Sequence, residues 1–503
     1  MSTTNAKARW SELQGSRSAV LQRARDAAKL TIPSLLPEEG TNDSTDLPQP
    51  YQSLGARGLN NLSSKLLLTL LPPNSAFFRL KIDADVIKQL GERSTDAESR
   101  LSEIERKIVF RTEGSNLRPV LGEVLKHLIV AGNAILYIPE DGMSRMYRLD
   151  QFCVVRDASG TPLESVIKEC VAPMTLPAAT RAACKVNESE KKNIDVYTHI
   201  VWKDGRCTYH EEINDVIVPG SEGDHPVDKC PWMVLRWIAV ANNDYGRGHV
   251  EEYMGDLTSL ESLSESLIGW ASVAAKINPL VRPGAGTLVE DLNNAENGEA
   301  IQGNADDVSY LQVEKLADFQ VVKGTIDELK LQLSYAFLLQ TGTVRNAERV
   351  TAEEIRAMAQ ELEDVLGGVY TVLAQELQLP LVRRWMAIME KQRAIPPLPK
   401  GVVAPVIVTG FEALGRNHAV NKLRAFLTDA SQMLGPQVVA QYINADVVLK
   451  QLGTGHGIEA LEELVKTQDQ VAQDMQNASL ASMGDKAAGP VAGQLAKAMT
   501  QQQ

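Results

Sequence analysis

The strongest hydrophobic pattern of the chain lies between Tyr245 and Asn278. Large apolar residues recur there every three or four positions, which is the spacing of one helix face and close to a coiled-coil period. Gly246 and Gly248 precede the pattern, and Pro279 cannot continue a helix. The pattern therefore predicts one helix of roughly 45 Å, at about 1.5 Å per residue.

The other face of this helix is predicted to be acidic and rich in serine. Its carboxylates are Glu251, Glu252, Asp256, Glu261 and Glu265. A buried helix with solvated acids on its outside, in an ordinary globular enzyme, would give the same pattern. Taken alone, the stretch does not separate that interpretation from a helix wall that presents acid to a partner.

The segments that follow predict a second, similar helix. Residues 279–324 are rich in Gly, Asn and Asp with short β-like pieces, and residues 325–339 repeat the apolar spacing of the first helix. This order predicts a pair of helices with a small β-containing tip between them. The next segment, 340–350, is a Gly/Thr/Asn loop that carries Arg345 and Arg349.

A very long helical pattern then runs from Thr351 to Lys391. Thr351 and Glu354 form a capping box at its start. A straight helix of this length would exceed about 55 Å. We expect it to bend at Gly367-Gly368 and at Pro380, because glycine pairs and proline are common causes of kinks.

The rest of the chain mixes helices with short strands. Residues 117–139 predict a helix that changes into a strand at Gly132-Asn133, and strand-like runs separated by turns continue to about residue 240. The last forty residues contain few large apolar groups. Other helices are predicted over 11–32, 53–71, 94–113 and 416–466, and extended segments over 77–82 and 396–410. The predicted fold class is α+β, mainly α, with a small, mostly antiparallel sheet in the first half.

Length and charge narrow the possible functions. The chain has 503 residues, enough for several domains, and its net charge is −13. A protein that grips nucleic acid usually shows a basic stripe, whereas most of this surface would repel phosphates. No window approaches the ~18 consecutive apolar residues of a membrane span, and the first residues lack a signal-peptide core. We expect no membrane contact.

Candidate chemistry is absent from the sequence patterns. The chain contains no GxxxxGK[ST] phosphate loop, and neither HExxH nor GxSxG occurs. Five widely spaced cysteines predict free thiols, and His127 on an apolar helix predicts a core residue rather than a ligand. We therefore expect no catalytic residue, cofactor or metal, and an architectural function.

Several runs of residues nevertheless resemble one family. They are ARGLNNLSSKLLLTLLP (56–72), VAGNAILYIPE (130–140), IDVYTHI (194–200), YGRGHVEEYMGDLTSLESL (245–263), ERVTAEEIR (348–356) and GGVYTVLAQELQLPLVRR (367–384). In order and spacing they resemble the head-to-tail connector, or portal protein, of short-tailed bacteriophages, closest to podoviruses that encode their own RNA polymerase. The resemblance covers about residues 10–420 and is weaker in the last eighty.

The resemblance implies a ring, normally of twelve subunits, at one vertex of the virion capsid, assembled in the host cytoplasm. Double-stranded DNA would pass through this homo-oligomer during packaging and ejection. The implied partners are the terminase large subunit, then a tail adaptor protein, together with the major capsid and scaffolding proteins.

The resemblance also implies a portal fold, onto which the predicted segments can be placed. Residues 1–245 would form most of the wing, 246–278 and 325–339 the two stem helices, 279–324 the clip, 340–350 the tunnel loop, 351–415 the bent helix and wing return, 416–470 the crown, and 471–503 a C-terminal tail. The acidic residues named above would line the channel. The tunnel loop would present Thr343, Arg345, Asn346 and Arg349 to DNA, and the clip would dock partners through Arg282, Glu290, Asp291, Asn293 and Asn294.

Alternatives remain at three points. Arg349 could simply pair with Glu353 at the start of the long helix. An enzyme of DNA metabolism or a packaging ATPase is disfavoured by the missing phosphate loop, and a nucleotide-hydrolysis assay would test it. A helical scaffold or adaptor without a DNA channel would share the composition but would form no ring with a central hole.

Overall fold

The computed structural model describes residues 5–42, 44–73, 76–83, 85–86, 94–141, 143–189, 192–274, 279–284, 286–296, 298–310, 316–339, 366–399, 402–407, 415–435, 437–438, 442–443, 448–449 and 452. The chain divides into two compact units, Met1–Gly410 and Phe411–Gln503. The main described element of the second unit is helix α14, Gly415–Leu434. The predicted tunnel loop (340–350), the start of the bent helix (351–365) and the tail (471–503) lie outside the described residues.

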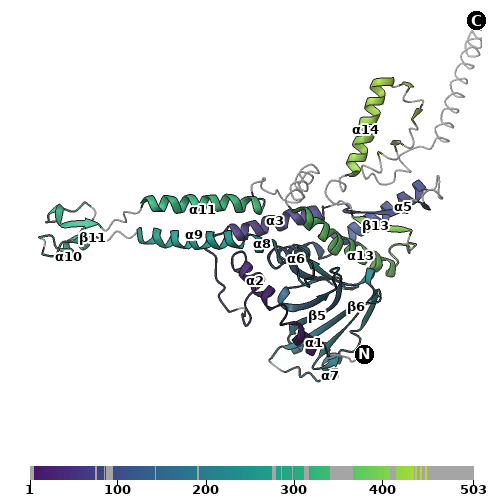
Figure 1. Ribbon diagram of the computed structural model, residues 1–503, viewed down its shortest axis with the longest axis horizontal. Helices are drawn as coiled ribbons and strands as arrows, with labels where there is room; N and C mark the ends of the chain where they lie inside the picture. The colour runs from purple at the N-terminus through teal and green to yellow at the C-terminus, as the bar shows by residue number, and fades with distance from the viewer. Residues whose placement is uncertain are drawn as a thin grey trace, which may run out of the picture. The chain divides into compact units, whose positions relative to one another are not determined.

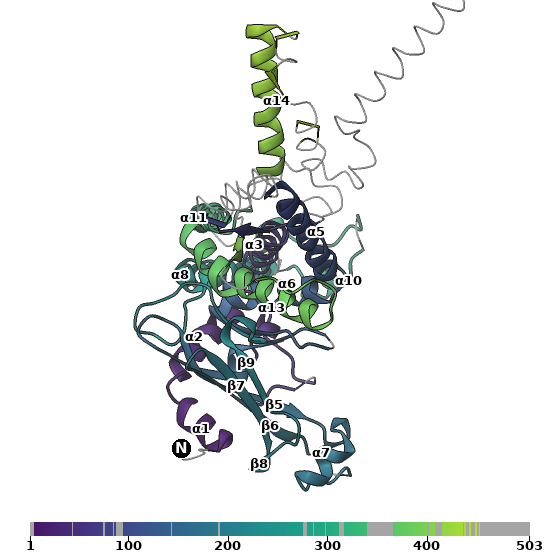
Figure 2. The ribbon, with the colours of Figure 1, turned by 90° about the vertical axis from the view of Figure 1, so that its right-hand side faces the viewer.

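A layer of helices forms the core of the first unit. Helix α6 is at its centre and contacts α2, α3 and α8 (Figure 2). These helices are α2 (Ser18–Lys29), α3 (Leu54–Leu70), α6 (Leu117–Ala131) and α8 (His249–Glu252). Most of α6 is buried because its apolar residues cover most of its circumference, and the polar residues Arg118, Glu123 and Lys126 share the one side that is partly exposed. It ends at Gly132 in the left-handed conformation, as the sequence predicts.

The first helical segment differs from its prediction. The helix expected over 11–32 is divided into α1, Ala6–Leu13, and α2, with a turn at residues 14–17. Gly15 lies in that turn, where its poor helix propensity favours the interruption. The turn lets α1 pack on strands instead of on the helices: Ala6 and Trp10 share a buried cluster with Cys153, Val166 and Tyr197.

Three antiparallel sheets are formed by the strand-rich first half of the chain together with the later strand β13. The largest has the order β4-β5-β6-β7-β8, with β9 also paired to β7. The second has the order β10-β2-β3, and the third pairs β1 with β13, far apart in sequence. Their bounds are Phe78–Ile82 (β1), Asn133–Tyr137 (β2), Arg145–Tyr147 (β3), Phe152–Arg156 (β4), Pro162–Val171 (β5), Ile194–Lys203 (β6), Arg206–Ile213 (β7), Val216–Ile217 (β8), Gly223–Pro226 (β9), Trp232–Arg236 (β10) and Val403–Ile407 (β13). Two more helices, α5 (Ser94–Glu113) and α7 (Ala178–Ala183), lie between strands in the sequence.

The described part of the long helix changes its winding near Pro380. Residues 366–373 are α-helical, so the backbone stays helical through Gly367 and Gly368. A π-helical turn, Ala374–Gln378, separates them from α13, Leu379–Lys391, which has Pro380 in its first turn. Proline lacks an N–H and its ring crowds the carbonyl four residues earlier, so a widened turn fits at this position.

The two predicted stem helices also differ from their predicted bounds. The first is interrupted at Tyr253, which follows the end of α8 at Glu252, and continues as α9, Met254–Ala274. The second, α11, spans Leu316–Ala336 and so begins nine residues before the predicted 325. Phe319 explains the longer helix, because its ring stacks on Trp270 of α9 with centroids 4.5 Å apart. Helices α9 and α11 lie side by side (Figure 1).

Candidate functional site: the stem helices, the tip and a charged pocket

The paired helices α9 and α11, called the stem helices below, pack through one apolar face each. Leu257 and Leu260 are buried on α9, and Ile326 and Leu333 are buried on α11. The spacing of threes and sevens keeps each pair on one side of its helix. The pairing thus accounts for the apolar pattern that the sequence showed in both segments.

On the other side of α11, three large apolar side chains are at least half exposed. Val321 is 70% exposed, Leu331 50% and Tyr335 60%. At 3.6 residues per turn these three positions fall within about 80° of arc, on the side away from Ile326 and Leu333, and the exposed Glu328 falls in the same arc. Large side chains gathered on an exposed face are typical of a contact with another molecule.

Two of the five predicted wall carboxylates bind within the chain. Glu251 pairs with Arg23 at 3.0 Å and with Arg247 at 3.3 Å. Glu261 accepts hydrogen bonds from the backbone N–H groups of Tyr51, at 2.8 Å, and Gln52, at 3.3 Å. These two carboxylates hold the helix to the N-terminal segment, so they serve the fold directly.

The other three wall carboxylates are more accessible. Glu252 is 46% exposed, and His249 Nδ1 lies 3.9 Å from one of its oxygens. Asp256 is half-buried and Glu265 is exposed. The structure therefore does not gather the five acids into one uniform face.

The tip between the stem helices is a small hairpin with a short helix. Strands β11 (Pro279–Val281) and β12 (Val308–Tyr310) pair antiparallel, and α10 spans Val289–Asn294. The Arg282 backbone N–H donates to the carbonyl of Asp307 at 3.0 Å, which extends the hairpin. All five predicted docking residues of the tip are exposed: Arg282, Glu290, Asp291, Asn293 and Asn294.

The predicted DNA-contacting residues Thr343, Arg345, Asn346 and Arg349 lie outside the described residues. The chain is described up to Leu339 on one side and from Leu366 on the other. Both flanks are partly buried in the core. The DNA-contacting role of Thr343, Arg345, Asn346 and Arg349 stays a prediction.

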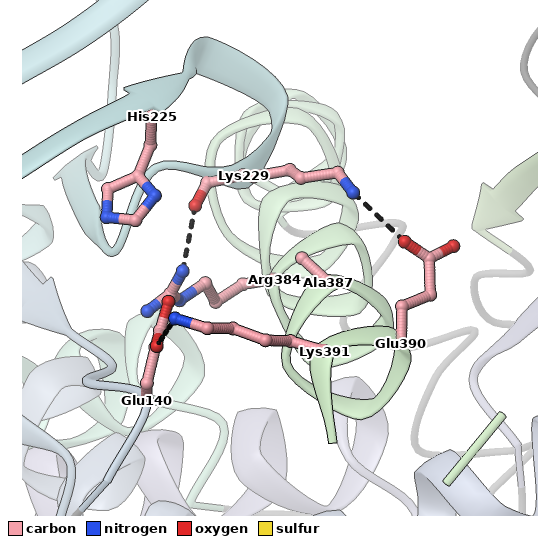
Figure 3. A pocket seen from close by; sticks show the side chains of 7 residues that line it. All are labelled: Glu140, His225, Lys229, Arg384, Ala387, Glu390 and Lys391. Atoms are coloured by element: carbon pink, nitrogen blue, oxygen red, sulfur yellow. Dashed lines mark hydrogen bonds and ion pairs between the residues drawn. The ribbon is translucent and has the colours of Figure 1, made fainter. Parts of the chain in front are cut away.

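A pocket of about 410 Å³ lies beside α13 and is crowded with charge (Figure 3). Lys229 Nζ pairs with Glu390 at 3.0 Å, and Lys391 pairs with Glu140. The Arg384 guanidinium donates from Nε and Nη1 to the carbonyls of Ile138 and Lys229, both at 3.0 Å. The lining residues are Glu140, His225, Lys229, Arg384, Ala387, Glu390 and Lys391. These bonds join α13 to the residues that follow β2 and β9, so the cluster stabilises the packing of α13 on the sheets.

The remaining groups of possible chemical interest are structural in the described chain. Burial lowers the pKa of His127 to about 4, so this core imidazole is neutral. All five cysteines are free thiols. Within the described ranges, no group of three or more His, Cys, Asp or Glu residues is arranged to hold a metal ion. In the same part of the chain, no helix combines the length and apolar character needed to span a bilayer.

Comparison with known proteins identifies the family. A family model described as "Bacteriophage head to tail connecting protein" matches residues 3–461. The portal protein of Enterobacteria phage T3 is 41% identical over 500 residues, covering 97% of this chain and 93% of the relative. The portal protein of Escherichia phage T7 is 40% identical over the same shares, and that of Enterobacteria phage SP6 is 34% identical over 83% of this chain and 81% of the relative.

Solved structures give weaker likenesses. The neck of an empty GTA particle computed with C6 symmetry aligns with a TM-score of 0.39 and 11% identity, over 80% of this chain and 90% of that chain. The virion of a native gene transfer agent particle aligns with a TM-score of 0.34 and 12% identity, over 83% and 95%. These values are too low to add to the assignment. By the family match and the identity over nearly its whole length, this chain belongs to the bacteriophage head-to-tail connecting proteins, as a portal protein of the type found in phages T3 and T7.

Proposed function

We propose that copies of this chain assemble into a ring, normally of twelve, whose central channel passes double-stranded DNA during genome packaging and ejection. The observation that carries this proposal is the exposed face of α11 that carries the large apolar side chains of Val321, Leu331 and Tyr335. A neighbouring copy would cover that face and repeat the contact around a closed ring. The stem helices would then form the channel wall.

The charge of the chain supports passage rather than binding of DNA. Each copy carries a net charge of −13, so a ring is strongly acidic. Duplex DNA carries one negative charge per ~1.7 Å of axis, and a wall of repeated cationic contacts would hold it tightly. An acidic wall repels the duplex instead and lets it slide. Glu252, Asp256 and Glu265 are the wall carboxylates available for this role.

Local positive charge in the tunnel loop would then act on the DNA. Residues 340–350 carry Arg345 and Arg349, with Thr343 and Asn346 beside them. We infer that Arg345 contacts phosphates transiently and hinders back-slipping. The Arg345→Ala variant should package DNA but retain less of it, and unchanged retention in filled heads would reject the phosphate contact.

The tip and the body would face different partners. The exposed set Arg282, Glu290, Asp291, Asn293 and Asn294 suits the docking first of the terminase large subunit and then of a tail adaptor protein. The body, residues 1–245 with the return through β13, would contact the major capsid and scaffolding proteins. Residues 416–470, which include all of α14 after Gly415, would form the crown, and assembly would take place in the host cytoplasm.

Electron microscopy of the purified chain tests the proposal most directly. Rings with a central hole wide enough for duplex DNA are the expected result. Particles without a hole would contradict the channel and favour a scaffold or adaptor. Counting the symmetry of the rings gives the number of subunits.

A further inference from the structure

The C-terminal end of α11 has an unusual conformation for its sequence. Leu338 has a φ of +53°, in the left-handed region where glycine is usual. The N–H of Leu339 donates to the carbonyl of Ser334 at 2.8 Å, and the N–H of Leu338 donates to Tyr335 at 3.1 Å. These two bonds form a Schellman turn, in which a leucine occupies the strained position.

Side chains from other helices saturate the carbonyl groups that this turn leaves free. Asn61 Nδ2 donates to the carbonyl of Phe337 at 3.1 Å and to that of Leu338 at 2.8 Å. Lys65 Nζ donates to the carbonyl of Leu338 at 2.9 Å. His249 Nε2 lies 3.0 Å from the carbonyl of Ala336 and acts as its donor. Three consecutive carbonyls at the end of one helix are therefore capped in trans.

The donors Lys65 and His249 are buried. Lys65 is 1% exposed and His249 is 3% exposed. Burial lowers the pKa of His249, so its imidazole is neutral and donates through Nε2. Lys65 lies at the negative end of the helix dipole, where a donor to the free carbonyls is favoured. Close packing adds to the clamp: a Cβ on Gly58 would lie 2.6 Å from Cγ of Phe337.

Helix α3 also receives the chain on its return. Gln378, in the π-helical turn, donates through Nε2 to the carbonyl of Leu70 at 2.9 Å. The described residues on both sides of 340–365 are thus bonded to the same helix, α3. Helix α3 therefore holds both the end of α11 before residue 340 and the turn at Gln378 after residue 365.

We propose that Asn61, Lys65 and His249 form a clamp that fixes the direction in which the chain leaves α11, and that they are positioning residues for the tunnel loop. This inference rests on the proposed function, since the loop follows directly at residue 340. In a ring, the same clamp would be repeated in every copy and would fix the exit from α11 at Leu339 in the same way. The strain at Leu338 is maintained because donors from two helices, α3 and α8, hold the turn.

Hydrogen exchange on the assembled protein tests the clamp. Asn61→Ala removes two of the donated bonds, while Asn60→Ala changes the exposed neighbour on the same helix. The amides of Phe337, Leu338 and Leu339 should exchange about tenfold faster in Asn61→Ala than in Asn60→Ala, because buried carbonyls lose their partners. Equal exchange at these amides would overturn the clamp.

A second variant and a second readout separate positioning from plain stability. Lys65→Met, which keeps the buried alkyl chain, should raise exchange at the same amides. Phage heads assembled with Asn61→Ala should lose packaged DNA at least several-fold faster than heads with Asn60→Ala. Faster exchange with unchanged DNA retention would overturn the positioning role. A chain that forms no ring would contradict the proposed function instead, and the exchange comparison can still be made on unassembled protein.

Discussion

At the scale of single residues, Gly132 shows how one position links three segments. It follows α6 with a φ of +72°, and a Cβ there would lie 2.4 Å from the carbonyl carbon of Arg247. Gly132→Ala should lower the free energy of unfolding by about 2 kcal/mol or more, from backbone strain and the clash with fixed backbone. Urea denaturation measures this. Gly286→Ala, at an exposed position of the tip where a Cβ meets no atom within 4 Å, is the control and should change little.

Glu164 gives a pH dependence at the same scale. Burial raises its pKa, but hydrogen bonds from His199 and Arg9 outweigh burial, and the pKa falls to about 2. A depressed carboxyl contributes stability above its unfolded pKa of about 4.3 and loses it as the pH falls toward 2. The advantage of the natural chain over Glu164→Gln should therefore be constant from about pH 5 to 6 and shrink below pH 5. Denaturation at each pH measures it.

A matched control for Glu164 lies on the same arginine. Glu12 pairs with Arg9 at 2.7 Å, but its side chain is 58% exposed. Exposed pairs contribute little to stability, so Glu12→Gln should follow the natural chain at every pH. A difference for Glu164→Gln that persists unchanged down to pH 2 would contradict the role assigned to its ionised form.

The sequence predicts the local conformation at single residues, but it does not predict which residues far along the chain they contact. Gly132 ends a helix through its own backbone freedom, which the sequence shows directly. The partners of Glu261, by contrast, are backbone N–H groups 210 and 209 residues away, and no pattern within the helix indicates them. The acidic wall was therefore predicted as one set, although the fold uses Glu251 and Glu261 internally. The bonds that Asn61 and Lys65 make to the end of α11 were not predicted for the same reason. A polar residue in an apolar helix does not indicate which distant group it will bind.

At the scale of elements, α11 carries the prediction that bears most on assembly. Val321→Glu places a carboxylate on the exposed face that carries Leu331 and Tyr335, where burial by a neighbouring copy would cost about 2 kcal/mol or more at each contact. Rings should be lost or weakened while the unassembled chain keeps its stability. Analytical ultracentrifugation measures the change. Lys323→Glu adds more negative charge on another side of α11 and should still assemble, and assembly of both variants alike would contradict the assigned face.

Element types followed from periodicity, whereas element bounds depended on packing. The change from helix to strand at Gly132 and the extended segments that form β1 and β13 were predicted, although their mutual pairing was not. Helix α11 is longer than predicted because Phe319 stacks on Trp270, a contact between residues far apart in sequence. The widened turn before Pro380 was anticipated as an irregularity, but proline alone does not specify a π-helical form.

At the scale of the whole molecule, the two units should separate in function and stability. Within the described residues, the buried clusters and the side chains packed on them extend no further than Ile407. A chain that ends at Gly410 should therefore unfold within about 1 kcal/mol of the full chain. Ending the chain at Pro399 removes β13 and its hydrogen bonds with β1, and it exposes Phe78 and Leu80 of β1 to water. The free energy of unfolding should therefore fall by about 3 kcal/mol or more.

Denaturant unfolding and electron microscopy of both truncated chains test this division. The chain ending at Gly410 keeps α9, α11 and the exposed face of Val321, Leu331 and Tyr335, so it should still form rings. If it folds but does not assemble, the contacts that close the ring belong to residues beyond 410, and the stem helices do not carry the interface. If the chain ending at Pro399 is as stable as the other, the strand pair of β1 and β13 is not part of the cooperative core.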